Sequence, residues 1–532
     1  MKKISILLLV IVAFLGSCQQ DFLELTPQDK LNSGDVWKDP KLIELVINEM
    51  YQSMPDGFSR GWYMLGAATD DGENSYGWPS GQSFNRGDYG PSNYPMGGTW
   101  FSSYQMIRQA NLFFDNIDAV EDIDADVKDR MVGEVHFLRA FYYFDLMRHY
   151  GGVPILDRAL SLDDDFSIPR NTKEEVIAFI INDLDAAASL LPTTHGSSLL
   201  GKANKGAANA LKGRTLLYAE KWAESASASK LVIDSGVYSL FSDYHSLFHA
   251  ANDNNEEVVF DKQFQEPELQ HWGHLFNHPV GYSGGWGGTG PTQELVDAYE
   301  MIDGKSIDDS PLYNPATPYA NRDPRLSATV FYDGSMWRGR AVETRIGGLD
   351  GMEKNGDATK TGYYMKKFLD ESFTDWANLG GSNNWIHIRY AEVLLNYAEA
   401  QNEASGPDDS VYDAVNQVRA RASVNMPPLP DGLSKDQMRD RIRNERRIEL
   451  AFEEHRFFDL RRWGLGDLLN RPIHGMRIGP NGELTGADAQ GKPYGRIEVE
   501  TRTFDQKNYL APIPQSEIDK LGSDVLQQNP GY

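Results

Sequence analysis

Helical sequence patterns are concentrated at the two ends of this chain, and that distribution constrains the fold more than any other feature. Apolar residues recur at helical spacing in a first group of segments and again in a last group. The first group comprises 42–54, 100–118, 125–150, 172–191, 204–218 and 222–235, and the last comprises 385–402, 411–422 and 434–463. The distribution predicts a mainly α-helical protein.

The segments 204–218 and 222–235 form a predicted helix pair that is rich in small residues. Ala207, Ala210 and Gly213 lie in the first segment, and Ala223 and Ala226 lie in the second. Small side chains permit close contact between helices, and paired helices with small residues at their crossings are typical of tetratricopeptide-like repeats. We therefore expect helical hairpins of this kind, although no full repeat consensus is present.

Two long regions lack helical periodicity. Residues 56–98 are rich in Gly, Asn, Ser, Asp, Tyr and Trp, and residues 236–382 add short β-like runs at 258–260 and 329–332. Long irregular loops usually carry function or are disordered, and the aromatic content argues against disorder. The expected organisation is an N-terminal helical scaffold at 41–235 with a long irregular loop at 56–98, an irregular insert at 236–382, and a C-terminal helical scaffold with its tail at 383–532.

The N-terminus has the pattern of a bacterial lipoprotein signal. Lys2 and Lys3 precede an apolar run at 4–15, which is shorter than the ~20 residues of a membrane span. The run ends in Leu15-Gly16-Ser17-Cys18, and this cysteine is the only one in the chain, which excludes an intramolecular disulfide. We predict a signal peptide at 1–17 and a lipidated N-terminus and tether at 18–40, with Cys18 as the lipid-bearing residue. The alternative is a free cysteine buried at a helix end.

The acidic charge limits the ligands and partners of the chain. It carries 51 Lys+Arg against 77 Asp+Glu, and loss of Lys2 and Lys3 with the signal takes the net charge from −26 to −28. Nucleic-acid binding needs a basic face and is excluded. Anionic headgroups would repel the body, so the acyl chains would hold it at the membrane. A neutral ligand fits this charge better than an anionic one, unless a local basic patch overrides it.

Several motifs together resemble the SusD/RagB family of nutrient-binding outer-membrane lipoproteins of Bacteroidetes. Each motif alone is weak, but the set occurs in the order of the family from the signal to the last residue. After the signal motif at 15–18, the set comprises IRQAN at 107–111, GEVHFLRAFYYF at 133–144, YGGVP at 150–154, PTQELV at 291–296, RDPR at 322–325, IRYAEVLL at 388–395, NERRIELAF at 444–452, DLRRW at 459–463, PIP at 512–514 and QNPGY at 528–532.

The resemblance implies both a fold and a function. The implied fold has about four tetratricopeptide-like helical hairpins and an irregular, loop-rich ligand-binding lobe. The implied function is non-enzymatic and uses no cofactor: capture of a glycan at the surface of the outer membrane and its delivery to a SusC-type TonB-dependent transporter. Binding aromatics of the family are commonly drawn from the loop before the IRxAN helix and from the insert, where Trp78 and Trp286 occupy comparable places.

Aromatic and hydrogen-bonding residues in these regions form the candidate glycan site. Aromatic faces stack on the C–H faces of sugar rings, and carboxylates or amides hold the hydroxyls. Glycine on both sides of Trp286 favours its exposure. The opposing interpretation is that Trp78 and Trp286 anchor their loops in small local cores. The candidates are Asp71, Asn74, Tyr76 and Trp78 in the first loop, Trp272, Tyr282 and Trp286 in the second, and Trp337 and Trp376 as a second rank.

Two alternative functions stay open at this point. One is a peptide-binding, RagB-like role in nutrient uptake, against which the Trp-rich loops argue mildly because peptides are gripped mainly through backbone hydrogen bonds. The other is a lipid-anchored glycoside hydrolase, which needs two carboxyl groups at a fixed separation. Asp70 and Asp71 with Glu73 are the best loop candidates for such a pair.

Two further clusters are better explained by structure than by ligand binding. The arginines of 439–462 alternate with carboxylates, and the spacings Arg441–Glu445 and Arg446–Glu449 favour a salt-bridged helix packed against the scaffold over a basic patch for an anionic ligand. The histidines of 271–278 lie on a loop-like stretch rather than on one helix face, so no metal site is expected there.

Overall fold

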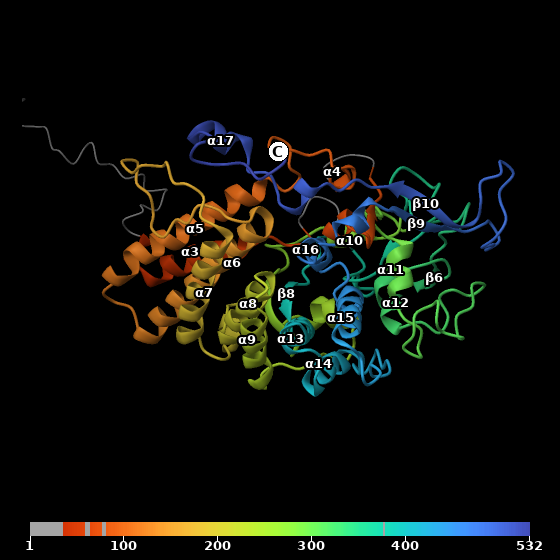
Figure 1. The fold of residues 1–532 in the computed structure, drawn as a ribbon, viewed down its shortest axis with the longest axis horizontal. Helices are drawn as coiled ribbons and strands as arrows, with labels where there is room; N and C mark the ends of the chain where they lie inside the picture. Colours follow the sequence, from red (N-terminus) through yellow and green to blue (C-terminus); the bar gives the residue numbers. More distant parts are fainter. Residues whose placement is uncertain (1–35, 59–63, 77–80, 376–377) are drawn as a thin grey trace, which may run out of the picture.

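A computed structural model describes residues 36–58, 64–76, 81–375 and 378–532, and most of its regular structure is helical (Figure 1). The predicted signal peptide and Cys18 lie outside the described residues. The helices are α3 (Pro40–Gln52), α4 (Gly81–Arg86), α5 (Gly98–Asn116), α6 (Ala125–Tyr150), α7 (Lys173–Leu190), α8 (Lys205–Tyr218), α9 (Trp222–Asp234), α10 (Gly273–Asn277), α11 (Gln293–Ala298), α12 (Pro324–Thr329), α13 (Tyr390–Ser405), α14 (Asp409–Arg419), α15 (Lys435–Glu449), α16 (His455–Arg462) and α17 (Gln515–Leu521).

The long helices form one continuous array. From α5 to α9, each helix packs against the next along the chain, and α9 then packs against α13, which contacts α14 and α15. In Figure 1 this array occupies the left and lower centre, while short strands and loops lie to the right. The two helical groups predicted from the sequence therefore join across the intervening region, and the predicted mainly α fold with tetratricopeptide-like hairpins is confirmed. Within the described part, no helix has the length and apolarity needed to cross a membrane.

Local sequence signals explain where these helices begin, end and touch. Thr172 and Glu175 form a capping box at the start of α7, and Asp124 caps α6. Gly151, with a φ of 76°, ends α6. A Cβ built on Gly213 of α8 would lie 2.6 Å from Oγ of Ser229 in α9, so the small residues of this pair do permit the close contact predicted for them.

The strands form short antiparallel pairs rather than a large sheet. The pairs are β1 (Gly72–Asn74) with β3 (Thr289–Pro291), β2 (Val258–Lys262) with β8 (Trp385–Arg389), β4 (Val330–Phe331) with β7 (Tyr364–Met365), β5 (Met336–Trp337) with β6 (Arg340–Ala341), and β9 (Pro472–Arg477) with β10 (Gly495–Thr501). The β2–β8 pair brings the chain that enters the loop-rich region beside the chain that leaves it.

Two helix boundaries predicted from the sequence are wrong. Residues 385–389 of the predicted helix 385–402 are strand β8, because Ile386 and Ile388 alternate with polar neighbours and pair with β2. The predicted helix 434–463 is two helices, α15 and α16, separated by a turn in which Phe452 and Glu454 have φ values of 63° and 67°. Glu454 accepts a hydrogen bond from the Leu65 backbone at 2.7 Å, a distant contact that stabilises this turn.

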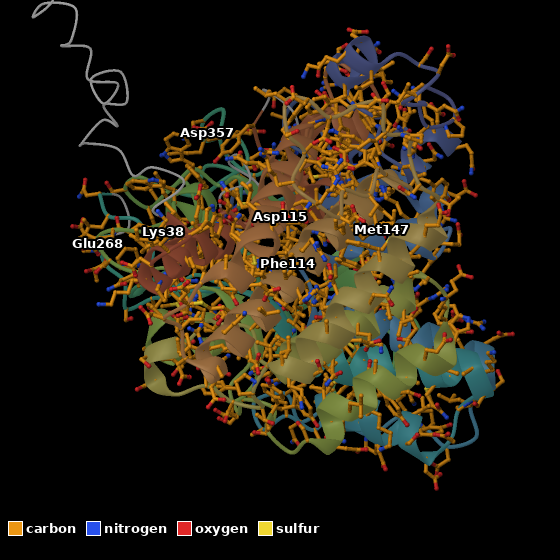
Figure 2. The ribbon with its side chains drawn as sticks, turned by 90° about the vertical axis from the view of Figure 1, so that its left-hand side faces the viewer. Lys38, Phe114, Asp115, Met147, Glu268 and Asp357 are labelled. Atoms are coloured by element: carbon orange, nitrogen blue, oxygen red, sulfur yellow. The ribbon has the colours of Figure 1, made fainter. Side chains whose placement is uncertain are left out.

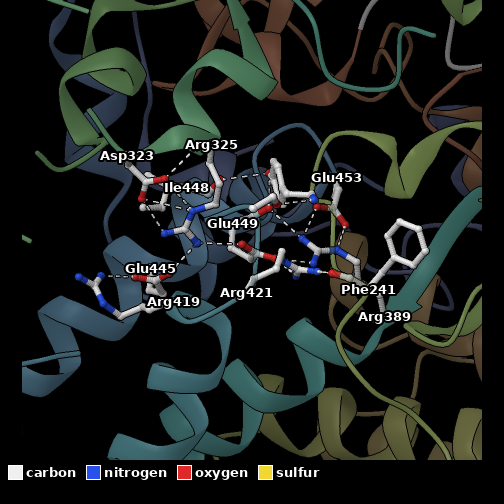
Figure 3. A network of polar contacts seen from close by, with 12 residues as sticks. Phe241, Asp323, Arg325, Arg389, Arg419, Arg421, Glu445, Ile448, Glu449 and Glu453 are labelled. Atoms are coloured by element: carbon white, nitrogen blue, oxygen red, sulfur yellow. Dashed lines mark hydrogen bonds and ion pairs between the residues drawn. The ribbon is translucent and has the colours of Figure 1, made fainter. Parts of the chain in front are cut away.

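The arginine-rich segment is the centre of a buried ionic network, shown in Figure 3. Glu449 at the end of α15 accepts hydrogen bonds from Arg325 at 2.8 Å and from Arg389 and Arg421 at 2.7 Å each. Burial alone would raise the pKa of Glu449, but the guanidinium groups of Arg421, Arg389 and Arg325 hold it well below its usual range. The predicted packing of a salt-bridged helix against the scaffold is thus confirmed.

The partners within that network differ from those predicted. The helical pairs Arg441–Glu445 and Arg446–Glu449 do not form, because Arg441 pairs with Glu300 at 2.8 Å and Arg446 pairs with Asp459 at 2.7 Å. A fully buried carboxylate needs several donors at once, and a single neighbour on the same helix supplies only one or two. The pairs therefore connect α15 to other elements rather than stabilising the helix by itself.

Candidate functional site

The two loops singled out in the sequence lie side by side. Strands β1 and β3 pair in antiparallel register, with Gly72 opposite Pro291 and Asn74 opposite Thr289. The Ser75 backbone N–H extends the pairing by donating to the Gly288 carbonyl at 3.0 Å. Residues more than 200 positions apart are therefore held together by backbone hydrogen bonds at the start of one loop and the end of the other.

The glycine-rich loop 281–288 folds back onto the short helix α10. The backbone N–H of Trp286 donates to the Leu275 carbonyl at 3.1 Å, and that of Gly288 donates to the Phe276 carbonyl at 2.6 Å. Gly287, between these two bonds, has a φ of 60°, and a Cβ built on it would lie 2.7 Å from the Tyr364 ring and 2.8 Å from the Asp357 carbonyl oxygen. Only glycine fits this position, which fixes where Trp286 points.

Three aromatic residues meet at this junction, and we call them the Trp286 ledge: Tyr76, Phe276 and Trp286. Trp286 is half-buried, with its ring centroid 5.7 Å from Phe276 and 6.4 Å from Tyr76, the latter in an edge-to-face arrangement. The Tyr76 hydroxyl donates to the Phe276 carbonyl at 3.2 Å. Tyr76 is only 1% exposed, so it supports Trp286 from below and, contrary to expectation, offers no surface of its own to a ligand.

Asp71 and Asn74 were expected to hold sugar hydroxyls, and both are buried inside the protein. Asp71 accepts from Nε of Arg447 at 2.6 Å, and the adjacent Asp70 accepts from Arg456 at 2.7 Å. Asn74 Oδ1 accepts the backbone N–H of Tyr76 at 3.0 Å. The sequence does not distinguish a surface carboxylate from a buried one that pairs with an arginine far away in the chain. The expectation that Asp71 and Asn74 bind sugar hydroxyls is therefore wrong.

The arginines also determine the charge state of this aspartate pair. Burial alone would raise the pKa of Asp70, but the guanidinium groups of Arg447 and Arg456 hold it well below its usual range. Burial raises the pKa of Asp71, since the opposing pull of Arg447 is partly cancelled by the Asp70 carboxylate. Both carboxyl groups thus serve to fix α15 and α16 to the β1 segment.

The remaining candidates are dispersed. Trp337 is 2% exposed and packs 5.1 Å from Phe331, so the expectation that it reaches a ligand is wrong, because its ring completes a small core. Tyr282 is half-buried and donates its hydroxyl to the Trp337 carbonyl at 2.8 Å, while the Arg340 guanidinium covers its ring at 3.8 Å. Trp272, at the start of α10, is 41% exposed. Trp78 and Trp376 lie outside the described residues.

Two polar residues beside the ledge were missed by sequence reasoning. Lys360 donates to the Asn74 carbonyl at 2.8 Å, and Asp357 belongs to the segment that contacts Gly287. Both lie in a loop of mixed polar residues without any motif, so only the fold brings them to Trp286. Asp357 is labelled in Figure 2, where it lies near loop segments at the upper left.

The three histidines of 271–278 are buried and neutral. His271 accepts the Gly273 backbone N–H on Nδ1 at 3.2 Å, and its Nε2 lies 3.0 Å from Oδ1 of Asn383. Burial lowers the pKa of His271 to about 3, of His274 to about 4 and of His278 to about 3. Among the residues described, no group of three or more His, Cys, Asp or Glu side chains is arranged to hold a metal ion.

These histidines are expected to make stability depend on pH. Below pH 6.5 the unfolded chain takes up protons that the folded protein excludes until about pH 3–4, so their contribution to the free energy of unfolding falls as the pH falls. Between pH 7 and pH 4.5, the free energy of unfolding of a His271→Asn variant should fall by about 2 kcal/mol less than that of the wild type. Urea unfolding at the two pH values measures this difference.

Two buried aspartates change the stability in the opposite direction as the pH falls, so their effect must be the same in the two proteins compared. Burial raises the pKa of Asp253 to about 7 and of Asp261 to about 6, so the folded state keeps protons that the unfolded chain releases. These groups are the same in the wild type and in His271→Asn, and the difference between the two proteins isolates the histidine. Parallel pH curves for both proteins would contradict a buried, neutral His271.

Comparisons with known proteins place this geometry in context. The family model described as "SusD family" matches residues 250–532, more than half of the chain, and the model described as "Starch-binding associating with outer membrane" matches residues 21–217. A relative called SusD-like protein P2, from Formosa agariphila, is 28% identical over 564 residues and covers 100% of both chains.

Solved structures agree with the family models. A SusD-like protein from Bacteroides fragilis is 32% identical, with a TM-score of 0.83 over 95% of this chain and 100% of that chain. A SusD-like carbohydrate binding protein from the same species is 28% identical, with a TM-score of 0.82 over 92% of this chain and 99% of that chain.

Proposed function

Because this chain belongs to the SusD family, we propose that it is a glycan-binding lipoprotein that captures poly- or oligosaccharide at the cell surface. The proposal includes a lipid anchor at Cys18 in the outer membrane and delivery of the glycan to a SusC-type TonB-dependent transporter. The observation that carries it is the junction of β1 and β3, where the half-buried Trp286 is held in place beside polar side chains.

The construction of the Trp286 ledge suits a sugar ring. Trp286 is fixed by Phe276 and Tyr76 and by the backbone bonds of loop 281–288, so little side-chain entropy is lost when a ligand stacks on its accessible part. The flanking residues Asp357 and Lys360 supply hydrogen-bonding groups at the edge of the ledge. An apolar face with polar groups at its rim is the arrangement by which proteins orient carbohydrates and other hydroxyl-rich ligands.

The aspartate pair considered for a glycoside hydrolase is not placed for catalysis. Hydrolysis needs two carboxyl groups that flank the scissile bond, with one of them available to protonate the leaving group. Asp70 and Asp71 are 7% and 1% exposed and face Arg456 and Arg447. A glycan therefore has no access to this pair, and the proposed function contains no hydrolytic step.

Removal of the Trp286 ring tests the proposal. Trp286→Ala should weaken binding of the glycan that the wild type prefers by roughly tenfold or more, because stacking and burial of an aromatic ring contribute about 1.5–3 kcal/mol. Affinity electrophoresis in gels containing starch, laminarin, xyloglucan, galactomannan or pectin identifies that glycan, and titration calorimetry gives the affinities. Circular dichroism and thermal unfolding show that the variant is folded.

Phe166→Ala provides the matched control, because Phe166 is an aromatic residue that is 48% exposed in the loop before α7. This variant should be retarded as strongly as the wild type. Failure of every glycan to retard the wild type would overturn the proposed function. Equal retardation of wild type and Trp286→Ala would instead exclude the Trp286 ledge as the binding site.

A further inference from the structure

Asp357 lies beside the Trp286 ledge, and the fold holds its backbone there. The backbone carbonyl of Asp357 approaches Gly287 so closely that a Cβ on that glycine would be 2.8 Å away. The Asp357 N–H donates to Oδ1 of Asn355 at 3.0 Å, which forms a tight local turn. Asp357 is half-buried, and in Figure 2 it lies among the loops rather than on the helical array. The backbone of Asp357 is therefore fixed relative to Gly287, the residue that follows Trp286.

The other charges in this area neutralise one another. Lys360 lies 3.3 Å from one oxygen of Glu73, and Arg502 lies 2.7 Å from the other. Arg502 also pairs with Glu500 at 2.8 Å. The two cations and the two carboxylates form one compact, electrically balanced group beneath β1.

Asp357 is not part of that balanced group. Within the described residues, its carboxylate forms no hydrogen bond and pairs with no cation. Burial raises the pKa of the Tyr76 hydroxyl, and the negative charge of Asp357 raises it further, so this charge acts on a residue of the ledge. One unit of uncompensated negative charge thus lies next to the aromatic surface.

An ionised carboxylate beside an aromatic binding surface favours neutral ligands over anionic ones. It accepts hydrogen bonds from two neighbouring hydroxyls, and bonds of this charge-assisted kind are roughly twice as strong as neutral ones. A ligand carboxylate or sulfate in the same place would meet a like charge in a poorly solvated contact, which disfavours its binding. The ledge should therefore prefer hydroxyl groups over acidic groups at its edge.

We propose that Asp357 is the specificity-determining residue of the Trp286 ledge: it binds hydroxyl groups of a neutral sugar stacked on Trp286 and rejects uronic-acid or sulfated sugars. This inference rests on the proposed glycan binding and adds the ligand class and the residue that selects it. The net charge of −26 points in the same direction, but Asp357 acts locally through its place beside the ring.

The test compares one glycan in two charge states. The probe is the neutral glycan that the wild type retains most strongly, together with the same glycan after oxidation of its primary hydroxyls to carboxylates. We expect the wild type to prefer the neutral form by tenfold or more. Asp357→Asn should bind the neutral form several-fold less tightly and narrow the preference to less than about threefold. Asp357→Lys should reverse it.

Asp308→Asn is the matched control, because it removes the same charge from an exposed loop residue outside the ledge and should leave the preference unchanged. Thermal unfolding establishes that each variant is folded. Equal binding of the two glycan forms by the wild type, or an unchanged preference in both Asp357 variants, would overturn the role of Asp357 while leaving glycan binding intact. Failure of the wild type to bind any neutral glycan would overturn the proposed function itself.

Discussion

Glutamine in place of Glu449 is expected to lower the free energy of unfolding by about 3–5 kcal/mol. The side chain of Glu449 is 0% exposed and is shared by Arg325 of α12, Arg389 at the end of β8 and Arg421 after α14. The neutral amide would leave these guanidinium groups with one carboxylate fewer in a region that water does not reach. Because the three arginines come from the loop-rich region and from the helical array, this change should loosen the contact between both parts.

Denaturant unfolding followed by circular dichroism measures this loss, and Glu517→Gln is the matched control. Glu517 pairs with Lys520 at 2.7 Å on the surface, where the lysine is 65% exposed, so its replacement should change the free energy of unfolding by less than about 1 kcal/mol. Similar losses in the two variants would show that the buried network does not hold the two parts together.

Alanine in place of Gly287 is expected to abolish most glycan binding without touching an aromatic ring. The new Cβ would meet the Tyr364 ring and the Asp357 carbonyl at distances below 3 Å, so loop 281–288 must shift and carry Trp286 with it. We expect a loss of affinity of at least tenfold, as measured by titration calorimetry. The left-handed backbone also costs an alanine about 1–2 kcal/mol of stability.

Gly347→Ala separates these two effects. Gly347 has a φ of 78°, but a Cβ there would have no atom within 4 Å. This control therefore shares the backbone strain and lacks the collision beside the ledge. It should lose stability and keep the affinity of the wild type. A Gly287→Ala variant with unchanged affinity would mean that the position of Trp286 is not what binds the glycan.

The helical part of the fold could be predicted because its signals are local. Thr172 with Glu175 marks the start of α7, and Gly151 marks the end of α6, within a few residues of one another along the chain. The segment 385–389 reads as helix in the sequence because the apolar pattern of α13 follows it directly, and only its pairing with β2 shows that it is a strand. Helical periodicity therefore predicts the helices, whereas the boundary between β8 and α13 depends on a tertiary contact.

The candidate site was predictable only in part, because most of its contacts are long-range. The composition of the two loops singled out Trp286 and Tyr76, and the structure brings these two together through β1 and β3. Asp71 was misplaced because Arg447, 376 positions away, draws its carboxylate inside the protein. Asp357 was missed because nothing near it in the sequence indicates that it lies beside Gly287.

Hydrogen exchange with mass spectrometry, with and without a saturating glycan, tests the central claim most directly. The ledge is built from loop 281–288, helix α10 and the segment around Asp357, so bound glycan should slow amide exchange in peptides covering 272–288 and 355–360. Peptides of α7, α8 and α9 should exchange at unchanged rates. Protection confined to those helices, with none at 272–288, would contradict the assignment of the Trp286 ledge as the place where this protein captures its glycan.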